Sequence, residues 1–151
     1  MKSKKILFSL DEVKSVVETH LVPLLKTHKV FTFQGPLGAG KTTMIKTLLA
    51  CCGVKEVVTS PTFSYVKQYH VVDEKCFYHF DLYRLTSLNS FLELGFDEYL
   101  NQENTVSVIE WPEVIGDLLL EEPLFSKVCA VTLDYVEGDL DSRSIQFERE
   151  L

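Results

Sequence analysis

Residues 35–42 read Gly-Pro-Leu-Gly-Ala-Gly-Lys-Thr and match the phosphate-binding pattern Gly-x-x-x-x-Gly-Lys-Thr at every required position. Glycines suit such a loop because backbone N–H groups must surround the anion, and a Cβ atom would obstruct their approach. A helix that starts where the loop ends adds free N–H groups and a dipole that favours negative charge. The spacing predicts a nucleotide site formed by Gly35, Leu37, Gly38, Ala39, Gly40, Lys41, Thr42 and Thr43.

The last residues of this motif carry side chains suited to separate tasks. We expect the ammonium group of Lys41 to neutralise the β- and γ-phosphates of ATP. The hydroxyl of Thr42 is expected to bind Mg²⁺, and Thr43 is placed to touch the α-phosphate.

Two acidic residues follow strand-like segments elsewhere in the chain. Segment 105–109 is apolar enough for a central strand and is followed by Glu110, and the strand-like segment 77–80 is followed by Asp81. Open α/β sheets bind ligands at the carboxyl ends of their strands, and hydrolysis at a phosphate loop also needs a carboxylate there. The spacing leaves open which acid holds Mg²⁺ and which positions water. Trp111 follows Glu110 directly, where core packing is the ordinary role of a tryptophan.

The elements expected around the loop are a strand at Val30–Gln34 and a helix at 41–50 that Gly53 closes. An edge strand at 4–9 precedes a helix with apolar residues at helical spacing, which Pro23 kinks or ends. We expect a short strand at 57–59, a hairpin of strands 64–72 and 75–80, and helices at 88–100 and 113–120. The last strands are expected at 128–135 and 143–148.

This alternation of strands and helices predicts an α/β fold. We expect a P-loop NTPase-type three-layer sandwich, with a mixed, largely parallel sheet flanked by helices and an antiparallel strand-rich portion. The length of 151 residues fits a single P-loop ATPase domain over residues 1–151.

Composition excludes several classes of function. The net charge of −7 and the pI of about 5.1 argue against a surface that grips nucleic acid directly, so any RNA is expected to be held by another protein. Four cysteines without ligand spacing are expected to be reduced thiols. No apolar run is long enough to cross a membrane, and no signal peptide is apparent. We therefore expect a cytoplasmic protein.

Several motifs, taken together, resemble the TsaE (YjeE) family of bacterial ATPases. Beyond the glycine-rich motif they read Ser-Pro-Thr-Phe at 60–63, His-Phe-Asp-Leu-Tyr-Arg-Leu at 79–85, Glu-Leu-Gly at 93–95 with Glu-Tyr at 98–99, and Ile-Glu-Trp-Pro at 109–112. These motifs keep the order of the family and extend over nearly the whole chain.

The resemblance implies a role in forming threonylcarbamoyladenosine, a modified base of tRNA. TsaE proteins work with the proteins TsaD and TsaB, which transfer a threonylcarbamoyl group to the adenosine beside the anticodon in tRNAs that read codons beginning with A. ATP hydrolysis by TsaE supports turnover of that complex. The expected partners are therefore TsaD and TsaB, with tRNA reached only through them and with no membrane involved.

The resemblance also assigns roles to individual residues. Thr42 and Glu110 would bind Mg²⁺, Lys41 would hold the phosphates, and Asp81 would be the acid needed for hydrolysis. Residues 60–62 would form a switch-like loop in which Thr62 senses the γ-phosphate. Trp111 would lie beside the nucleotide, while residues 9–12 and Arg143 would approach the adenine and ribose.

One residue departs from the family pattern. Many family members have an acidic residue where this chain has Pro36, which lacks a backbone donor and is expected to alter nucleotide affinity modestly.

Two other functions stay open. The alternatives are a small-molecule kinase with the same phosphate loop and an ATP-sensing regulatory module. A GTPase is disfavoured because no Asn-Lys-x-Asp segment occurs. His79 alternates with aromatic residues and is expected to be a strand histidine rather than a catalytic group.

Overall fold

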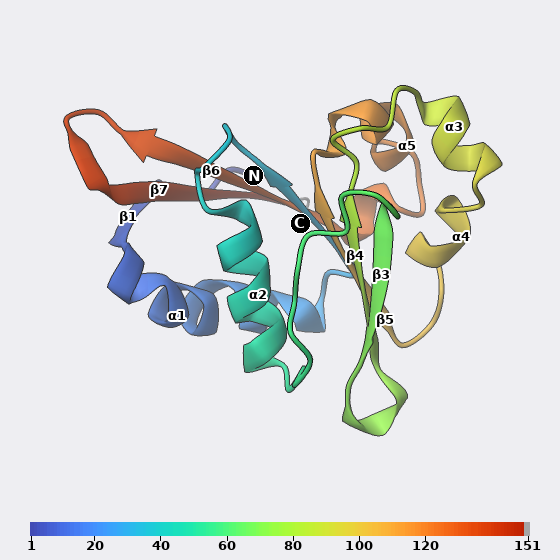
Figure 1. The fold of residues 1–151 in the computed structure, drawn as a ribbon, viewed down its shortest axis with the longest axis horizontal. Helices are drawn as coiled ribbons and strands as arrows, with labels where there is room; N and C mark the ends of the chain where they lie inside the picture. Colours follow the sequence, from blue (N-terminus) through green and yellow to red (C-terminus); the bar gives the residue numbers. More distant parts are fainter. Residues whose placement is uncertain (150–151) are drawn as a thin grey trace.

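The strands of the chain pair into one seven-stranded sheet (Figure 1). A computed structural model describes residues 1–149. The strand order is β1-β7-β6-β2-β5-β4-β3. Strands β2, β4, β5 and β6 make the three parallel pairings, and the other three pairings are antiparallel. The bounds are Ile6–Ser9 for β1, Val30–Gln34 for β2, Val66–His70 for β3, Cys76–Asp81 for β4, Thr105–Glu110 for β5, Val128–Val136 for β6 and Asp139–Arg149 for β7.

Helices cover the two faces of this sheet and make the three layers that the sequence predicts (Figure 1). On one face lie α1 and α2, and on the other lie α3, α4 and α5. Their bounds are Val13–Val16 for α1, Lys41–Cys51 for α2, Leu88–Glu93 for α3, Asp97–Leu100 for α4 and Gly116–Leu119 for α5. The segment after α1 continues as a π-helical turn and then as a 3₁₀ turn over Val22–Lys26. That change falls at Pro23, which cannot donate a helical hydrogen bond.

Two expected elements differ in the structure. Residues 57–59 form no strand, although all three are β-branched, because no neighbouring strand pairs with them. Val58 is instead buried in the core beneath α2. The expected helix over 88–100 is divided into α3 and α4 at Gly95, whose φ of +75° ends the first helix. The predicted hairpin is confirmed as β3 and β4, and β7 begins earlier than expected, at Asp139.

Strands in the middle of the sheet are buried on both faces. Phe31 and Phe33 of β2 pack into the core beneath α1 and α2, while Val30 faces the core under α3–α5. Because β2, β5 and β4 are parallel neighbours, their carboxyl ends meet at one edge of the sheet. In this register Glu110 lies opposite both Phe33 and Asp81. The fold therefore brings the end of β2 and two carboxylates together.

The four cysteines are free thiols, as the sequence predicts. Burial raises the pKa of the Cys52 thiol and of the Cys129 thiol to about 11, so both stay protonated near neutral pH. Among residues 1–149, no helix combines the length and apolar character needed to cross a bilayer.

Close packing against β6 requires a glycine at position 35, and substitution of Gly35 tests this packing. Its φ is +148°, and a Cβ atom there would lie 2.2 Å from the Leu133 carbonyl oxygen. Gly95 also has a positive φ, but a Cβ atom there meets nothing within 4 Å. We expect Gly95→Ala to cost about 1 kcal/mol of unfolding free energy. Gly35→Ala should cost about 1–3 kcal/mol more, as in an overpacked core. Urea unfolding measures both, and equal losses would contradict the clash.

Candidate nucleotide site

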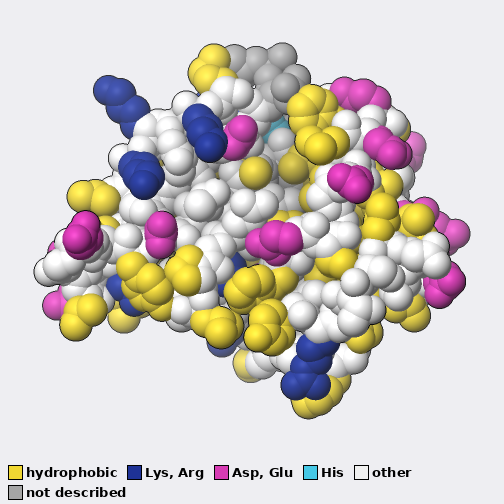
Figure 2. All heavy atoms as spheres, turned by 90° about the horizontal axis from the view of Figure 1, so that it is seen from above, with side chains coloured by type: hydrophobic (Ala, Val, Ile, Leu, Met, Phe, Trp, Pro, Cys, Tyr) yellow, Lys and Arg dark blue, Asp and Glu magenta, His cyan; other side chains and the backbone are white. Residues whose placement is uncertain are grey.

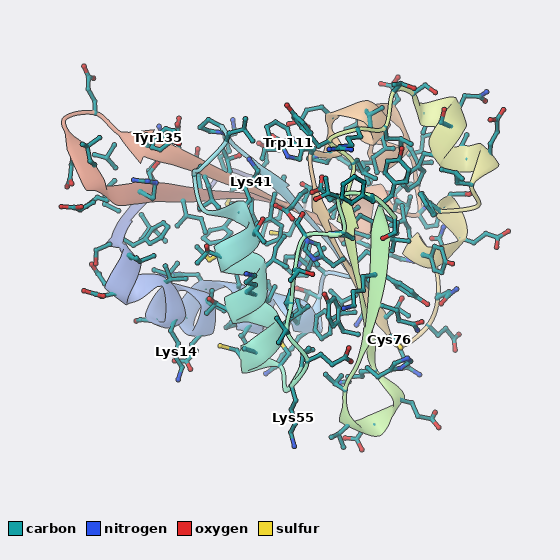
Figure 3. The ribbon with its side chains drawn as sticks, in the orientation of Figure 1. Lys14, Lys41, Lys55, Cys76, Trp111 and Tyr135 are labelled. Carbon is teal, nitrogen blue, oxygen red and sulfur yellow. The ribbon has the colours of Figure 1, made fainter. Side chains whose placement is uncertain are left out.

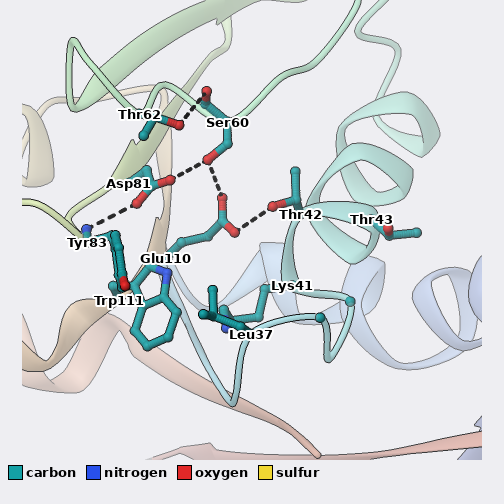
Figure 4. A pocket seen from close by; sticks show the side chains of 12 residues that line it. Leu37, Lys41, Thr42, Thr43, Ser60, Thr62, Asp81, Tyr83, Glu110 and Trp111 are labelled. Carbon is teal, nitrogen blue, oxygen red and sulfur yellow. Dashed lines mark hydrogen bonds between the residues drawn. The ribbon is translucent and has the colours of Figure 1, made fainter. Parts of the chain in front are cut away.

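A cleft of about 410 Å³ opens at the edge of the sheet where β2, β5 and β4 end (Figure 4). The glycine-rich loop, residues 35–40, leads from β2 into α2 and forms one wall. Segment 60–62 and the residues after β4 and β5 form the opposite wall. The lining residues are Leu37, Gly38, Gly40, Lys41, Thr42, Thr43, Ser60, Thr62, Asp81, Tyr83, Glu110 and Trp111.

Lys41 lies at the first position of α2 (Figure 3). Its side chain folds back over the glycine-rich loop. Its Nζ donates to the carbonyl oxygens of Gly35 at 2.5 Å and Pro36 at 3.0 Å. The same Nζ lies 4.0 Å from the ring centroid of Trp111, a cation–π contact. Burial lowers the pKa of Lys41, and the nearby carboxylates of Glu110, Glu113 and Asp81 oppose that shift. The structure thus holds one ammonium group at the loop.

Glu110 is the acid at the centre of the site and is only 3% exposed. Its Oε1 accepts a hydrogen bond from the Thr42 hydroxyl at 2.7 Å. Its Oε2 lies 2.7 Å from His79 Nε2 and 3.3 Å from Ser60 Oγ. Burial alone would raise the pKa of Glu110, but the hydrogen bonds from His79, Thr42 and Ser60 outweigh it and lower the pKa. The carboxylate is therefore held in its ionised form.

Asp81 lies beside Glu110 and is bridged to it by a hydroxyl group. Ser60 Oγ donates to Asp81 Oδ2 and also lies near Glu110 (Figure 4). The backbone N–H of Tyr83 donates to Asp81 Oδ1 at 3.1 Å. Thr62 Oγ1 turns back to the Ser60 carbonyl oxygen at 3.5 Å. The two acids and segment 60–62 thus form one hydrogen-bonded wall.

Sequence reasoning named most of this site but missed four of its residues. Tyr83 was quoted only as part of a motif, and it lines the cleft and donates its backbone N–H to Asp81. Ser60 was quoted as part of a motif but was given no role of its own. Its hydroxyl, next to Pro61 in that motif, is the feature that could have marked it as a hydrogen-bond donor in the site. His79 was expected to be a strand histidine, and it contacts Glu110 directly. Tyr135 on β6 donates from its hydroxyl to the Leu37 carbonyl oxygen. No motif contains it.

A second cavity of about 240 Å³ adjoins the cleft across the glycine-rich loop. It shares Gly38, Gly40 and Thr43 with the cleft, and Ala39 lines this cavity rather than the cleft. Its outer wall includes Phe8, Leu10, Val13, Met44, Leu140, Asp141 and Arg143. Arg143 therefore lies outside the cleft, with its guanidinium 4.6 Å from the ring centroid of Tyr135. Of the expected segment 9–12, Leu10 lines the cavity, and Gly35 lines neither space.

Fold and site together define a class of protein. The chain is an α/β protein with one mixed sheet, in which a glycine-rich loop joins a central strand to a helix and two carboxylates face that helix. Within this class, the family model described as "Threonylcarbamoyl adenosine biosynthesis protein TsaE" matches residues 9–145. The chain belongs to the TsaE family.

Relatives and a solved structure agree with this assignment. A protein of Rickettsia conorii, named tRNA threonylcarbamoyladenosine biosynthesis protein TsaE, is 33% identical over 150 residues, which cover 92% of this chain and 83% of that protein. A Bacillus subtilis protein of the same name is 34% identical over 116 residues, covering 76% and 69%. The crystal structure of Bacillus subtilis YdiB has a TM-score of 0.65 and 28% identity, covering 97% of this chain and 86% of that one.

The buried carboxylate makes a testable prediction about stability and pH. The pKa of Glu110 lies below its ordinary value of 4.5 in the folded protein, so the unfolded chain takes up the proton first as the pH falls. The ionised group contributes its full stabilisation above that value and loses it as the pH falls through the folded pKa. We expect the unfolding free energy of wild type minus that of Glu110→Gln to decrease as the pH falls below about 5.

Urea unfolding at several pH values measures this difference. Thr42→Val removes one of the hydrogen bonds that lower the pKa, so the folded and unfolded pKa values lie closer together in that variant. Its loss of stability should therefore be smaller and should end at a higher pH. A difference that does not change with pH would show that Glu110 is not held as described.

Proposed function

We propose that this protein is a Mg²⁺-dependent ATPase that acts with TsaD and TsaB in forming threonylcarbamoyladenosine in tRNA. One observation carries the proposal above all others. The hydroxyl of Thr42 and the carboxylate of Glu110, which come from two different elements, meet at 2.7 Å in a cleft that also contains Lys41. A hydroxyl at the start of the helix and an acid on the neighbouring strand are the two protein ligands that such a hydrolase uses for its metal.

The phosphate groups of ATP would bind along the glycine-rich loop and the start of α2. With 11 residues, α2 is long enough for its first N–H groups and its dipole to attract an anion. Lys41 already lies over this loop, and its ammonium would exchange the carbonyl oxygens of Gly35 and Pro36 for phosphate oxygens. The exchange replaces neutral acceptors with charged ones, which make stronger hydrogen bonds.

The donor set at the head of the cleft fits Mg²⁺. This ion prefers oxygen ligands and keeps several of its waters, so one hydroxyl and one carboxylate suffice on the protein side. Thr42 and Glu110 supply these two oxygens. When bound, Mg²⁺ would neutralise charge that develops on the phosphate oxygens during the reaction.

Asp81 would orient the water that attacks the γ-phosphorus. Its carboxylate lines the cleft beside Thr62, and Ser60 and the Tyr83 amide fix its two oxygens. Attack by water breaks the bond from the γ-phosphorus to the bridging oxygen and yields ADP and inorganic phosphate. Thr62 is the hydroxyl on segment 60–62 that would sense the γ-phosphate. The adenine and ribose would occupy the second cavity, between Leu10 and Arg143.

The partners and the location follow from the family rather than from the cleft. Relatives are named for threonylcarbamoyladenosine biosynthesis in tRNA, and we propose TsaD and TsaB as the proteins that this chain serves. Its net charge of −7 supports contact with tRNA only through those partners. Among described residues on the face drawn in Figure 2, Lys and Arg side chains lie in small separate groups among acidic and apolar ones. The cytoplasm is the proposed location.

Replacing Lys41 tests the enzymatic proposal. We expect Lys41→Ala to lower ATP hydrolysis by at least about 100-fold, because it removes the cation that meets the phosphates. Lys46→Ala, an exposed lysine on the same helix, should leave hydrolysis unchanged. Phosphate release measures turnover, and the fluorescence of Trp111, the single tryptophan, reports nucleotide binding. Asp81→Asn should keep binding and lose hydrolysis. Binding by wild type without any phosphate release would instead favour an ATP sensor.

Reconstitution tests the biological role. With purified TsaD, TsaB, unmodified tRNA and the threonylcarbamoyl donor, wild-type protein should support several rounds of modification per complex. Lys41→Ala should support no more than the mixture without this chain, while Lys46→Ala should match wild type. Quantifying the modified nucleoside in digested tRNA gives the result. Equal yields with and without wild-type protein would refute the proposed role.

A further inference from the structure

His79 contacts the acid at the centre of the site from inside the protein. Its side chain is fully buried, and its Nε2 lies 2.7 Å from Glu110 Oε2. An ionised carboxylate can only accept a hydrogen bond, so the hydrogen lies on Nε2 and the imidazole is the donor. His79 does not line the cleft, and a bound ligand would not touch it.

The strand register explains why a histidine two residues before Asp81 reaches Glu110. Alternate residues of a strand point to the same face, so His79 and Asp81 both face α2. In the pairing of β4 with β5, Asp81 lies opposite Glu110 and His79 lies opposite Val108. The imidazole therefore lies one step deeper in the sheet than the carboxylate and approaches it from the core side.

The three donors to Glu110 are not equivalent. Thr42 is itself a proposed ligand of the metal, and Ser60 shares its single hydroxyl hydrogen with Asp81, the closer of its two partners. Both of these hydroxyl groups line the cleft, where a nucleotide and a metal would compete for them. His79 is the donor that faces no such competition, because it is buried behind the carboxylate. Its Nδ1 has no hydrogen-bond partner among residues 1–149.

We infer that His79 is a positioning residue for the metal site. Its hydrogen bond holds Glu110 Oε2, so that Oε1 is presented to Thr42 and to the divalent cation. This inference rests on the proposed function, since it assigns a partner to the proposed metal ligand. Groups that hydrogen-bond a metal ligand typically change metal affinity by about 10–100-fold when they are removed. A histidine that served only the core would affect stability and leave metal affinity unchanged.

Substitutions that differ in reach separate these two roles. His79→Gln can place an amide N–H near the position of Nε2 and should keep the contact. His79→Asn carries an amide but ends too early to reach Glu110, and His79→Leu has no donor. Phe77→Leu is the matched control. Phe77 lies on the same strand and face, is buried in the core beneath α2, and takes no part in the hydrogen bonds that Glu110 makes with Thr42, Ser60 and His79.

The measurement is Mn²⁺ binding to the full chain in the presence of ADP, followed by electron paramagnetic resonance. The affinity for ADP without metal, read from Trp111 fluorescence, and the urea unfolding midpoint are measured in parallel. We expect His79→Asn and His79→Leu to bind Mn²⁺ at least about 10-fold more weakly, with the metal-free ADP affinity unchanged. His79→Gln should lie within about threefold of wild type, and Phe77→Leu should lose stability only.

Each outcome decides one question. If wild type and Glu110→Gln bind Mn²⁺ equally, the proposed metal site itself fails. If Glu110→Gln loses Mn²⁺ while every folded His79 variant keeps the wild-type affinity, the metal site stands and the role of His79 is refuted. If Phe77→Leu loses as much Mn²⁺ affinity as His79→Asn, the effect comes from general destabilisation and the inference also fails.

Discussion

An ionised carboxylate buried at the end of a central strand is the constraint around which this structure is arranged. Glu110 is 3% exposed, and a charge so far from water is stable only with several hydrogen-bond donors. The donors come from three separate parts of the chain: Thr42 on α2, His79 on β4 and Ser60 in the loop before β3. The hydrogen bonds to this one carboxylate therefore fix the positions of α2, two strands and a loop relative to one another.

The antiparallel half of the sheet fixes the other wall of the cleft. The Leu133 carbonyl oxygen on β6 leaves room for no side chain at Gly35. On the same strand lies Tyr135 (Figure 3), whose hydroxyl donates to the Leu37 carbonyl oxygen. Arg143 on β7 covers the Tyr135 ring in turn. The glycine at the start of the loop is thus needed for packing against a neighbouring strand, in addition to any approach of phosphate. Strands β6 and β7 support the loop much as β4 and β5 support the acids.

The sequence was sufficient for features encoded in short segments. The glycine-rich motif, the strand before it, the helix after it and the acids that end two strands could all be predicted from composition and spacing. Contacts between distant segments could not be predicted in this way. Thr42 and Glu110 are 68 residues apart, Ser60 and Glu110 are 50 apart, and His79 and Glu110 are 31 apart. Only the register of β4 with β5 turns His79 toward an acid, and no local pattern contains that register.

The charges in the cleft connect this arrangement to the role of a metal in the proposed nucleotide binding. Of the described residues that line the cleft, Asp81 and Glu110 are acidic, and Lys41 is the one cation. The charges of Glu110, Glu113 and Asp81 already act on that ammonium group. A triphosphate in the cleft would add negative charge close to the two acids, and such repulsion is strong where the surroundings exclude water. A divalent cation between the carboxylate and the phosphates would replace this repulsion with a net attraction. In the proposed function, the acid that the fold must stabilise with buried donors would also make nucleotide binding depend on metal, so the geometry of Glu110 would govern both.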